Sequence, residues 1–364
     1  MDRSIINSLR LERQRLLVQA NEDDYDELFR AMSPVHTLYW TEPGAPPLLM
    51  RRASFDDLSY NQARRAGRKI LKGRYQNGSV GYVDERDLEL YACAYRKGIP
   101  SLGFEDLAIC DLLLKEGPMT INDIKRATGL FAKYIKPALL KLQQAFLVFE
   151  DQIDNDWDRA WYAFESEFPD VDPDRYGRTE AIEIIIKRFA SLSVAACAES
   201  VKSFYGFNSA ETGAAIKALV ESGEISFLGD DGFFCLREDE EIVNGGGAAA
   251  LPKKVFLLHR SDFWVKSEEY LLKKRFAYGR RKRGDAEAAD GDGGAPSDVL
   301  YYVVIDGEIS GAVLGRFKFG PHLVEDVVVA EGARCDRDEI LEAVCEIFDK
   351  ESSPAKRFNG MIIN

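Results

Sequence analysis

Residues 104–164 read FEDLAICDLLLKEGPMTINDIKRATGLFAKYIKPALLKLQQAFLVFEDQIDNDWDRAWYAF, and their hydrophobic pattern predicts three helices followed by a β-hairpin. The first helix covers residues 104–117 and ends before a proline. The third covers residues 131–145, where apolar side chains recur at helical spacing. Two alternating runs, starting at Phe146 and Trp161, then predict a pair of strands.

The short middle helix has suitable residues at both of its ends. Thr120 occupies an N-cap position, and Asp123 follows three residues later, which is close to a capping box. Gly129 stands where a left-handed residue commonly closes a helix. A helix, a helix–turn–helix and a hairpin, in this order, are typical of a winged helix.

The same order of elements is predicted twice more. Residues 179–236 contain three helical patterns, with Asn208-Ser209 capping the third, and a hairpin that turns at residues 229–232, Gly-Asp-Asp-Gly. The first hundred residues contain a looser copy, whose hairpin turns at Asn77-Gly78. In that copy residues 4–17 and 23–32 are taken as the first two helices. Because the pattern repeats, the prediction of tandem winged helices is stronger than it would be from any single copy.

The chain changes character after residue 243. A small-residue linker at 244–252 leads into β-rich sequence with a turn at Asp306-Gly307, interrupted by an acidic, glycine-rich segment at 284–298 that is typical of a disordered surface loop. We therefore expect an α+β fold made of three tandem winged-helix domains and a C-terminal β-rich, barrel-like domain. The expected domain boundaries are 1–98, 99–172, 173–243 and 250–364.

Charge and composition exclude several classes of protein. The 364 residues carry 61 acidic against 48 basic side chains, a net charge of −13, which argues against bulk coating of nucleic acid. No apolar run is long enough to cross a membrane, and the N-terminus lacks the apolar core of a signal peptide. The six cysteines and three histidines are scattered. We therefore expect a cytoplasmic monomer with reduced thiols, no metal site and no cofactor.

Basic side chains are concentrated in two stretches, and groups of this kind contact DNA phosphates in winged helices. The first stretch, residues 61–75, contains no acid. Its candidate DNA-binding residues are Arg64, Arg65, Arg68, Lys69, Lys72 and Arg74. The second group comprises Lys273, Lys274, Arg275, Arg280, Arg281, Lys282 and Arg283, to which Arg316 and Lys318 on a predicted strand are added. The alternative interpretation of either stretch is a solvated charged face.

Several segments also resemble one family of DNA repair enzymes. They are ELFRAMSPVHTL (27–38), ILKGRYQNGSVGYV (70–83), KEGPMTINDIKRATG (115–129), VFLLHRSDFW (255–264) and DGEISGAVLGRFKF (306–319). Through these segments the chain is similar to the winged-helix DNA glycosylases of the AlkZ and YcaQ type. The resemblance implies tandem winged helices and a C-terminal barrel that form a C-shaped groove for double-stranded DNA. It also implies hydrolysis of the N-glycosidic bond of bulky N7-alkylated or crosslinked purines.

The family's catalytic motif is Gln-Φ-Gln or Gln-Φ-Asp, where Φ is apolar, and it follows the second helix of the first winged domain. By resemblance it falls on His36-Thr37-Leu38, so that His36 and Leu38 occupy the two polar positions of a degenerate motif. His36 can orient a water molecule or act as a weak base near neutral pH, whereas Leu38 can do neither. The family's first-wing run, Arg-Gly-Thr-Leu-His, is replaced by Asn77–Gly81, which lacks the Arg and the His.

The residues leave the function of the chain open between several interpretations. The chain is either an active glycosylase or a catalytically silent DNA-binding or regulatory protein, and winged helices also serve as scaffolds that bind protein.

Tyr39 and Trp40 are candidates for stacking on an extruded base or for the core, and the loop acid Glu42 is the carboxylate nearest to the motif. His259 and Asp262 are expected to be structural or to touch the DNA backbone.

Overall fold

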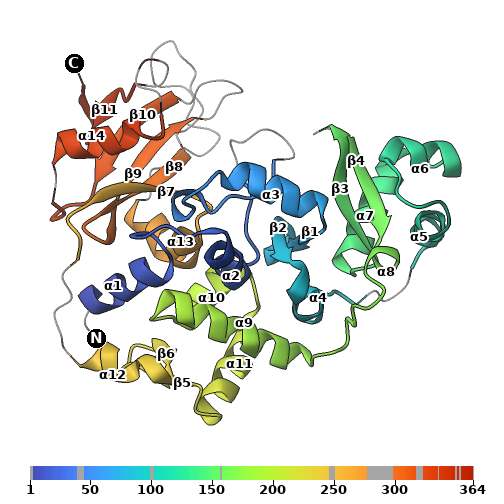
Figure 1. Ribbon diagram of the computed structural model, residues 1–364, viewed down its shortest axis with the longest axis horizontal. Coiled ribbons are helices and arrows are strands. Elements are labelled where there is room, and N and C mark those ends of the chain that lie inside the picture. The colour runs from blue at the N-terminus through green and yellow to red at the C-terminus, as the bar shows by residue number, and fades with distance from the viewer. Residues whose placement is uncertain are drawn as a thin grey trace, which may run out of the picture. The chain divides into compact units, whose positions relative to one another are not determined.

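The computed structural model contains both helices and strands, which confirms the α+β class (Figure 1). It describes residues 3–38, 45–98, 102–155, 158–245, 251–276, 298–316, 323–334, 336–348, 351 and 354–363. The chain divides into two compact units, Glu12–Glu241 and a second unit made of Met1–Leu11 with Ile242–Asn364. The first unit ends beside the boundary expected at residue 243, while its division into three separate domains stays a prediction.

Within Glu12–Glu241, three segments repeat one order of helices and a hairpin, and we call them the first, second and third repeat. The first repeat consists of α2 (Glu22–Met32), η1 (Met50–Arg52), α3 (Asp57–Ala66), β1 (Ile70–Tyr75), η2 (Gln76–Gly78) and β2 (Ser79–Asp84). The short helices η3 (Glu85–Asp87) and α4 (Leu88–Tyr95) follow it. The predicted turn at Asn77-Gly78 is confirmed, because both residues have a positive φ between the paired strands.

The second and third repeats match the sequence prediction closely. The second consists of α5 (Phe104–Glu116), α6 (Ile121–Thr128), α7 (Ala132–Gln144), β3 (Val148–Asn155) and β4 (Asp158–Ala163), followed by α8 (Phe164–Glu167). The third consists of α9 (Arg178–Ser193), α10 (Ala198–Tyr205), α11 (Ser209–Glu221), β5 (Ile225–Phe227) and β6 (Phe234–Leu236), followed by η4 (Arg237–Asp239) and α12 (Glu240–Asn244). The expected caps are present: Thr120 and Asp123 form a capping box, and Gly129 closes α6 at φ 72°.

Isolated β-bridges show which helices of the three repeats correspond. In the second and third repeats the residue between the first two helices pairs with the last hairpin strand, Met119 with Trp161 and Ala196 with Phe234. The equivalent bridge of the first repeat joins Val35, which follows α2, to Tyr82. Therefore α2 is the counterpart of α5 and α9. The prediction that residues 4–17 form the first helix of this repeat was wrong.

The helix α1 (Arg3–Arg13) instead begins in the unit that contains the C-terminal residues. Its Arg10 makes an ion pair of 2.7 Å with Glu268 on α13 (Phe263–Arg275) and lies over the ring of Trp264, 5.0 Å from the ring centroid. Trp264 donates its indole N–H to the same carboxylate at 3.0 Å. Because all three groups are satisfied together, a specific polar contact holds α1 to α13.

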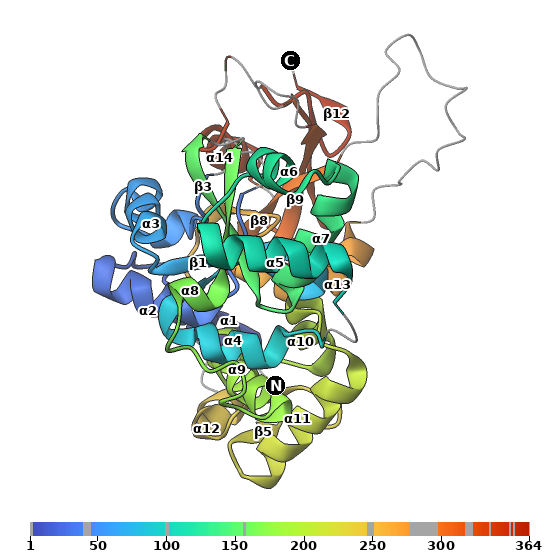
Figure 2. The ribbon, with the colours of Figure 1, turned by 90° about the vertical axis from the view of Figure 1, so that its right-hand side faces the viewer.

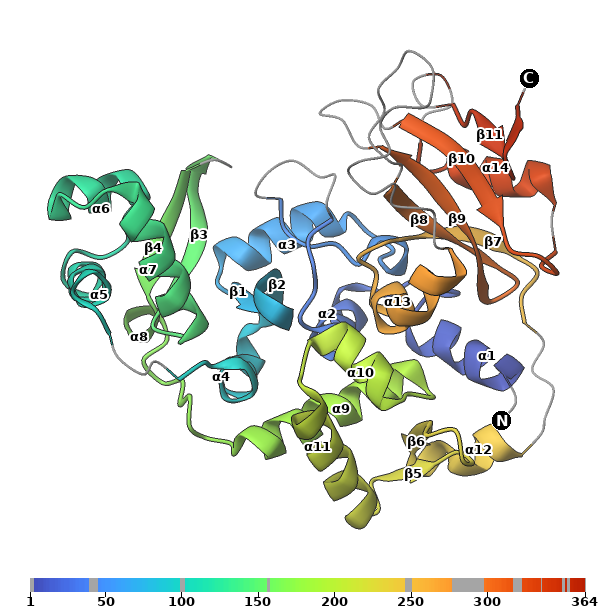
Figure 3. The same ribbon diagram turned by 180° about the vertical axis from the view of Figure 1, so that it is seen from behind.

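The C-terminal unit contains a six-stranded sheet in the order β12-β11-β10-β9-β8-β7 (Figure 3). Its strands are β7 (Val255–His259), β8 (Asp298–Ile305), β9 (Glu308–Arg316), β10 (Leu323–Val329), β11 (Arg357–Phe358) and β12 (Met361–Ile362), and α14 (Arg337–Cys345) precedes β11. With β7 and β12 at its edges, the sheet is open among the described residues, and the expectation of a barrel is corrected in this respect. At Gly311 of β9 a Cβ would lie 2.7 Å from the Val328 carbonyl oxygen, which explains a glycine in mid-strand.

No helix in the described part of the chain is long and apolar enough to cross a membrane.

Candidate functional site

His36 lies on a short extended segment beside the first hairpin. The neighbouring residue Val35 exchanges two backbone hydrogen bonds with Tyr82 of β2, at 2.8 and 2.9 Å. His36 is half-buried as a residue, its Nε2 atom is buried, and its Nδ1 lies 3.1 Å from the Val80 carbonyl oxygen. A carbonyl oxygen only accepts hydrogen bonds, so in the neutral ring Nδ1 carries the proton and Nε2 is the basic nitrogen. The hairpin therefore fixes both the orientation and the tautomer of His36.

The other two positions of the motif are less suited to holding a water molecule. Thr37 and Leu38 are half-buried, and the Leu38 side chain has no donor or acceptor for water. Tyr39, Trp40 and Glu42 lie outside the described residues. Because α2 corresponds to the first helix of the other repeats, the motif follows a first helix here, and not a second one as the family pattern implies.

Gln76 is a candidate that the sequence did not reveal. It lies in η2, at the turn of the first hairpin, with a positive φ of 32° and only 5% of its surface exposed. Neither polar atom of its amide finds a hydrogen-bond partner within the described residues. A buried amide in this state is costly, and strained backbone often marks functional positions, so this side chain suits a role in binding water or substrate.

Gln76 and the segment that contains His36 both lie close to Gly81. A Cβ on Gly81 would lie 3.0 Å from Cβ of Pro34 and 3.6 Å from Oε1 of Gln76. The bridge between Val35 and Tyr82 sets a register in which His36 comes opposite Gly81. The absence of a side chain at Gly81 thus leaves the amide and the imidazole on one face of the hairpin.

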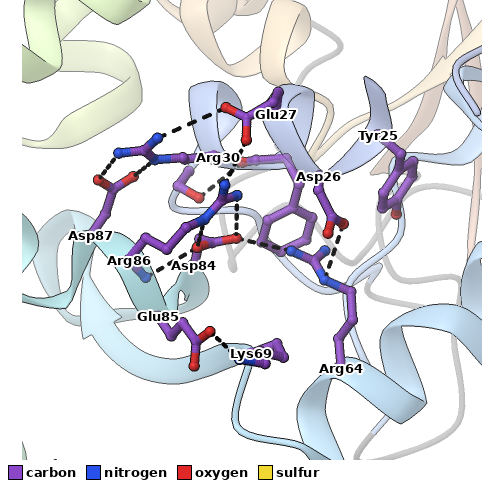
Figure 4. Close-up of polar contacts among 12 residues, drawn as sticks. Tyr25, Asp26, Glu27, Arg30, Arg64, Lys69, Asp84, Glu85, Arg86 and Asp87 are labelled. Carbon is purple, nitrogen blue, oxygen red and sulfur yellow. Dashed lines mark hydrogen bonds and ion pairs between the residues drawn. The ribbon is translucent and has the colours of Figure 1, made fainter. Parts of the chain in front are cut away.

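The first basic stretch is largely buried and paired with acids. The guanidinium of Arg64 is 6% exposed, donates to Asp84 at 3.0 Å and lies 3.2 Å from Asp26 (Figure 4). Asp84 also accepts from Arg86 at 2.7 Å, and Lys69 pairs with Glu85 (Figure 4). Arg65 is buried as well.

The remaining cations of this stretch face the second hairpin. Lys72 and Arg74 lie 3.3 and 3.7 Å from Oε1 of Glu150 on β3, and Arg159 on β4 lies 3.1 Å from Oε2. Burial lowers the pKa of Lys72. Burial also raises the pKa of Glu150, but the cations Lys72, Arg159 and Arg74 outweigh it and hold that pKa below its usual value. The Arg68 guanidinium pairs with Asp151 and stacks on Tyr162, 4.6 Å from the ring centroid.

Most of the six candidate cations are therefore buried or paired with acids of other elements, and they do not form an open basic surface. Lys69, whose side chain is 60% exposed, is the one among them that mainly faces solvent. Acids elsewhere in the chain pair with five of the six, Arg64, Arg68, Lys69, Lys72 and Arg74. A role of any of them in DNA binding stays a prediction.

The second basic group is only partly described. Lys273, Lys274 and Arg275 are exposed at the end of α13; Lys273 lies 2.9 Å from Glu269, and Arg275 donates to the Ile309 carbonyl oxygen at 2.9 Å. Arg316 donates from Nε to Glu325 at 2.8 Å. Arg280, Arg281, Lys282, Arg283 and Lys318 lie outside the described residues.

His259 and Asp262 have structural partners. His259 is fully buried, and its Nδ1 lies 3.1 Å from the Ser261 backbone nitrogen and 2.6 Å from the Ser261 hydroxyl. Asp262 caps α13 by accepting from the Trp264 backbone N–H at 2.9 Å. Both side chains thus shape the turn between β7 and α13.

The fold is similar to that of a solved DNA glycosylase. One similar structure is described as Streptomyces sahachiroi DNA glycosylase AlkZ. The alignment covers 98% of this chain and 98% of that chain, with a TM-score of 0.65 and 14% sequence identity. At this identity the likeness concerns the fold. No protein-family model matches the sequence, and no curated protein sequence matches it.

Proposed function

We propose that this protein binds double-stranded DNA and hydrolyses the N-glycosidic bond of bulky N7-alkylated purines, with His36 at the reacting water. The observation that supports this most is the likeness to a DNA glycosylase over nearly the whole chain, combined with a histidine held in one tautomer at the motif position. Sequence resemblance to the AlkZ and YcaQ type points the same way. Crosslinked purines are a further substrate in this proposal.

The chemistry needs few groups. An N7-alkylated purine is cationic and leaves readily, so the protein has to orient and polarise a water near C1′ and stabilise the oxocarbenium-like transition state. In our proposal Nε2 of His36 accepts a hydrogen bond from that water and takes its proton as the bond from water oxygen to C1′ forms. The Gln76 amide, which can donate and accept, holds the same water in place of the side chain that Leu38 lacks.

We expect His36→Ala to lower excision strongly. Loss of a positioned base typically costs about 10²-fold or more. The assay incubates the protein with an N7-methylguanine duplex and then cleaves abasic sites with alkali. His36→Gln, which restores an amide able to hold water, should keep part of the rate, and thermal unfolding should show that both variants fold. Equal excision by wild type and His36→Ala would exclude His36 from the reaction.

We expect Gln76→Met to separate catalysis from folding. The change keeps the shape of the side chain and removes a buried amide that lacks a protein partner, so the free energy of unfolding should stay the same or rise. Excision should nevertheless fall by about tenfold or more if the amide holds the water. Loss of stability together with an unchanged rate would show that Gln76 is merely structural.

The second candidate is a catalytically silent DNA-binding or regulatory protein, favoured by the apolar Leu38 at the second motif position. Gel shifts on undamaged and N7-alkylated duplexes, run beside the excision assay, distinguish the two. Salt-sensitive binding without abasic sites at any protein concentration would support the silent protein. Absence of binding to both duplexes would overturn both proposals. The charge reversal of Arg64, Arg65 and Arg68 is unsuitable for testing a protein scaffold, because these side chains are buried or paired.

A further inference from the structure

The helix–turn–helix of the second repeat is strongly basic in a protein that is acidic overall. Residues 121–144, which contain α6 and α7, carry five basic side chains and one acid, Asp123. The five are Lys125, Arg126, Lys133, Lys136 and Lys141. None of them belongs to the two basic stretches that the sequence pattern singled out.

Most of these cations are available to a partner. Lys125, Lys133 and Lys136 are exposed and make no ion pair within the described part of the chain. The Arg126 side chain is 77% exposed, and its pair with Asp123, three residues away, contributes little in water. Lys141 differs, because it pairs with the buried carboxylate of Asp106.

The exposed face is held rigidly by the core beneath it. Ile135, Ala138, Leu139 and Leu142 of α7 are buried against α5, α6 and the hairpin. Figure 2 shows α5, α6 and α7 side by side at the front of this view. The turn is fixed by Gly129 and by Thr128, whose hydroxyl donates to the Ile124 carbonyl oxygen at 2.7 Å. The opposite face of α7 is therefore presented in one orientation.

Two exposed aromatic rings lie at the start of α7. Phe131 is 64% and Tyr134 47% exposed, and Nζ of Lys133 is 4.9 Å from the Tyr134 ring centroid. In helix–turn–helix proteins the first residues of the second helix of this motif enter the major groove. Lysines reach phosphates from there, and apolar rings can contact thymine methyl groups.

The equivalent surfaces of the other repeats lack this charge. Residues 198–221, which contain α10 and α11, carry two lysines against three glutamates. In the first repeat Arg52 of η1 and the arginines of α3, Arg64 and Arg65, are buried, and Arg51 of η1 is half-buried. The second repeat is thus the one whose exposed charge complements a polyanion among the described helix–turn–helix surfaces.

We propose that α6 and α7 of the second repeat form the surface that contacts the phosphate backbone of duplex DNA, through Lys125, Arg126, Lys133 and Lys136. This inference rests on the DNA binding proposed above and assigns it to a particular surface. Phe131 and Tyr134 face the groove of the duplex. The two basic stretches found by sequence are then not needed for the main contact.

The test compares two double charge reversals in the full-length protein. Lys133→Glu with Lys136→Glu changes the proposed surface, and Lys202→Glu with Lys217→Glu makes the same change of net charge on the third repeat. Binding to a fluorescent undamaged duplex is measured by anisotropy over a range of salt concentrations. We expect the first variant to bind at least about tenfold more weakly and to reduce the slope of log K against log salt by about 2, since two phosphate contacts are lost. The second should change neither by a comparable amount.

The outcomes separate this proposal from the function it rests on. If the wild type binds and both variants bind equally well with the same salt slope, the surface assignment is overturned while DNA binding stands. If the two variants lose affinity equally, overall charge is responsible and the assignment fails as well. If the wild type binds no duplex at any salt concentration, the proposed function fails together with the surface.

Discussion

Asp87→Asn should destabilise the protein by about 1.5–3 kcal/mol, the range for hydrogen bonds to charged groups. The Asp87 carboxylate is 3% exposed and accepts two hydrogen bonds from Arg30 on α2, at 2.8 and 3.0 Å, and two from Arg188 on α9, at 2.6 and 3.0 Å. Figure 4 shows the pair with Arg30. An amide cannot balance two guanidinium groups, so the contact between the first and third repeats weakens. Urea unfolding measures the loss.

The pH dependence gives a second readout of the same contact. Burial raises the pKa of Asp87, but hydrogen bonds from Arg30 and Arg188 outweigh it and lower that pKa below its usual value. A carboxyl with a lowered pKa stabilises the fold above its unfolded pKa, about 3.9, and loses this contribution as the pH falls through the folded value. The stability difference between wild type and variant should therefore shrink below about pH 4.

A surface carboxylate provides the matched control. Asp174 pairs with Arg96, but its side chain is 73% exposed, so Asp174→Asn should cost less than about 1 kcal/mol. If Asp87→Asn costs no more than this control, the four hydrogen bonds do not form in solution.

The sequence predicted the fold where the signals are local. Thr120, Asp123 and Gly129 set the ends of α6 through hydrogen bonds within a few residues, so their pattern is legible without tertiary structure. The role of α1 could not be predicted from local sequence signals. Helical periodicity shows that a segment has an apolar face but not which partner covers it, and Arg10 of α1 finds Glu268, 258 residues away.

The candidate site was predictable only in part, for the same reason. His36 was found through a resemblance, but its tautomer depends on Val80, a residue of the hairpin. The basic stretch contains no acid, which suggested free cations, yet Asp84, Glu150 and Asp151 pair with it in the folded chain. Gln76 precedes a predicted turn, and nothing in a single sequence indicates that its amide is buried without a partner.

Glu150→Gln should weaken the junction between the first and second repeats by about 3–5 kcal/mol. The Glu150 side chain is 1% exposed and is the counter-charge of Lys72, itself 8% exposed. An amide leaves the Lys72 ammonium buried without a carboxylate, in surroundings that already lower its pKa by burial. Arg74 and Arg159 also lose a partner, but they are more exposed and can turn to solvent. Chemical denaturation measures the change.

A second variant shows whether the buried charge is the cause. Adding Lys72→Met to Glu150→Gln removes the unpaired ammonium and should recover about 1 kcal/mol or more, within the coupling energies of residues in contact. As a control, Glu85→Gln removes the partner of Lys69, whose side chain is 60% exposed, and should cost less than about 1 kcal/mol. If Lys72→Met instead destabilises the Glu150→Gln protein further, the lysine contributes through packing of its methylene groups and the ion pair is not what joins the two hairpins.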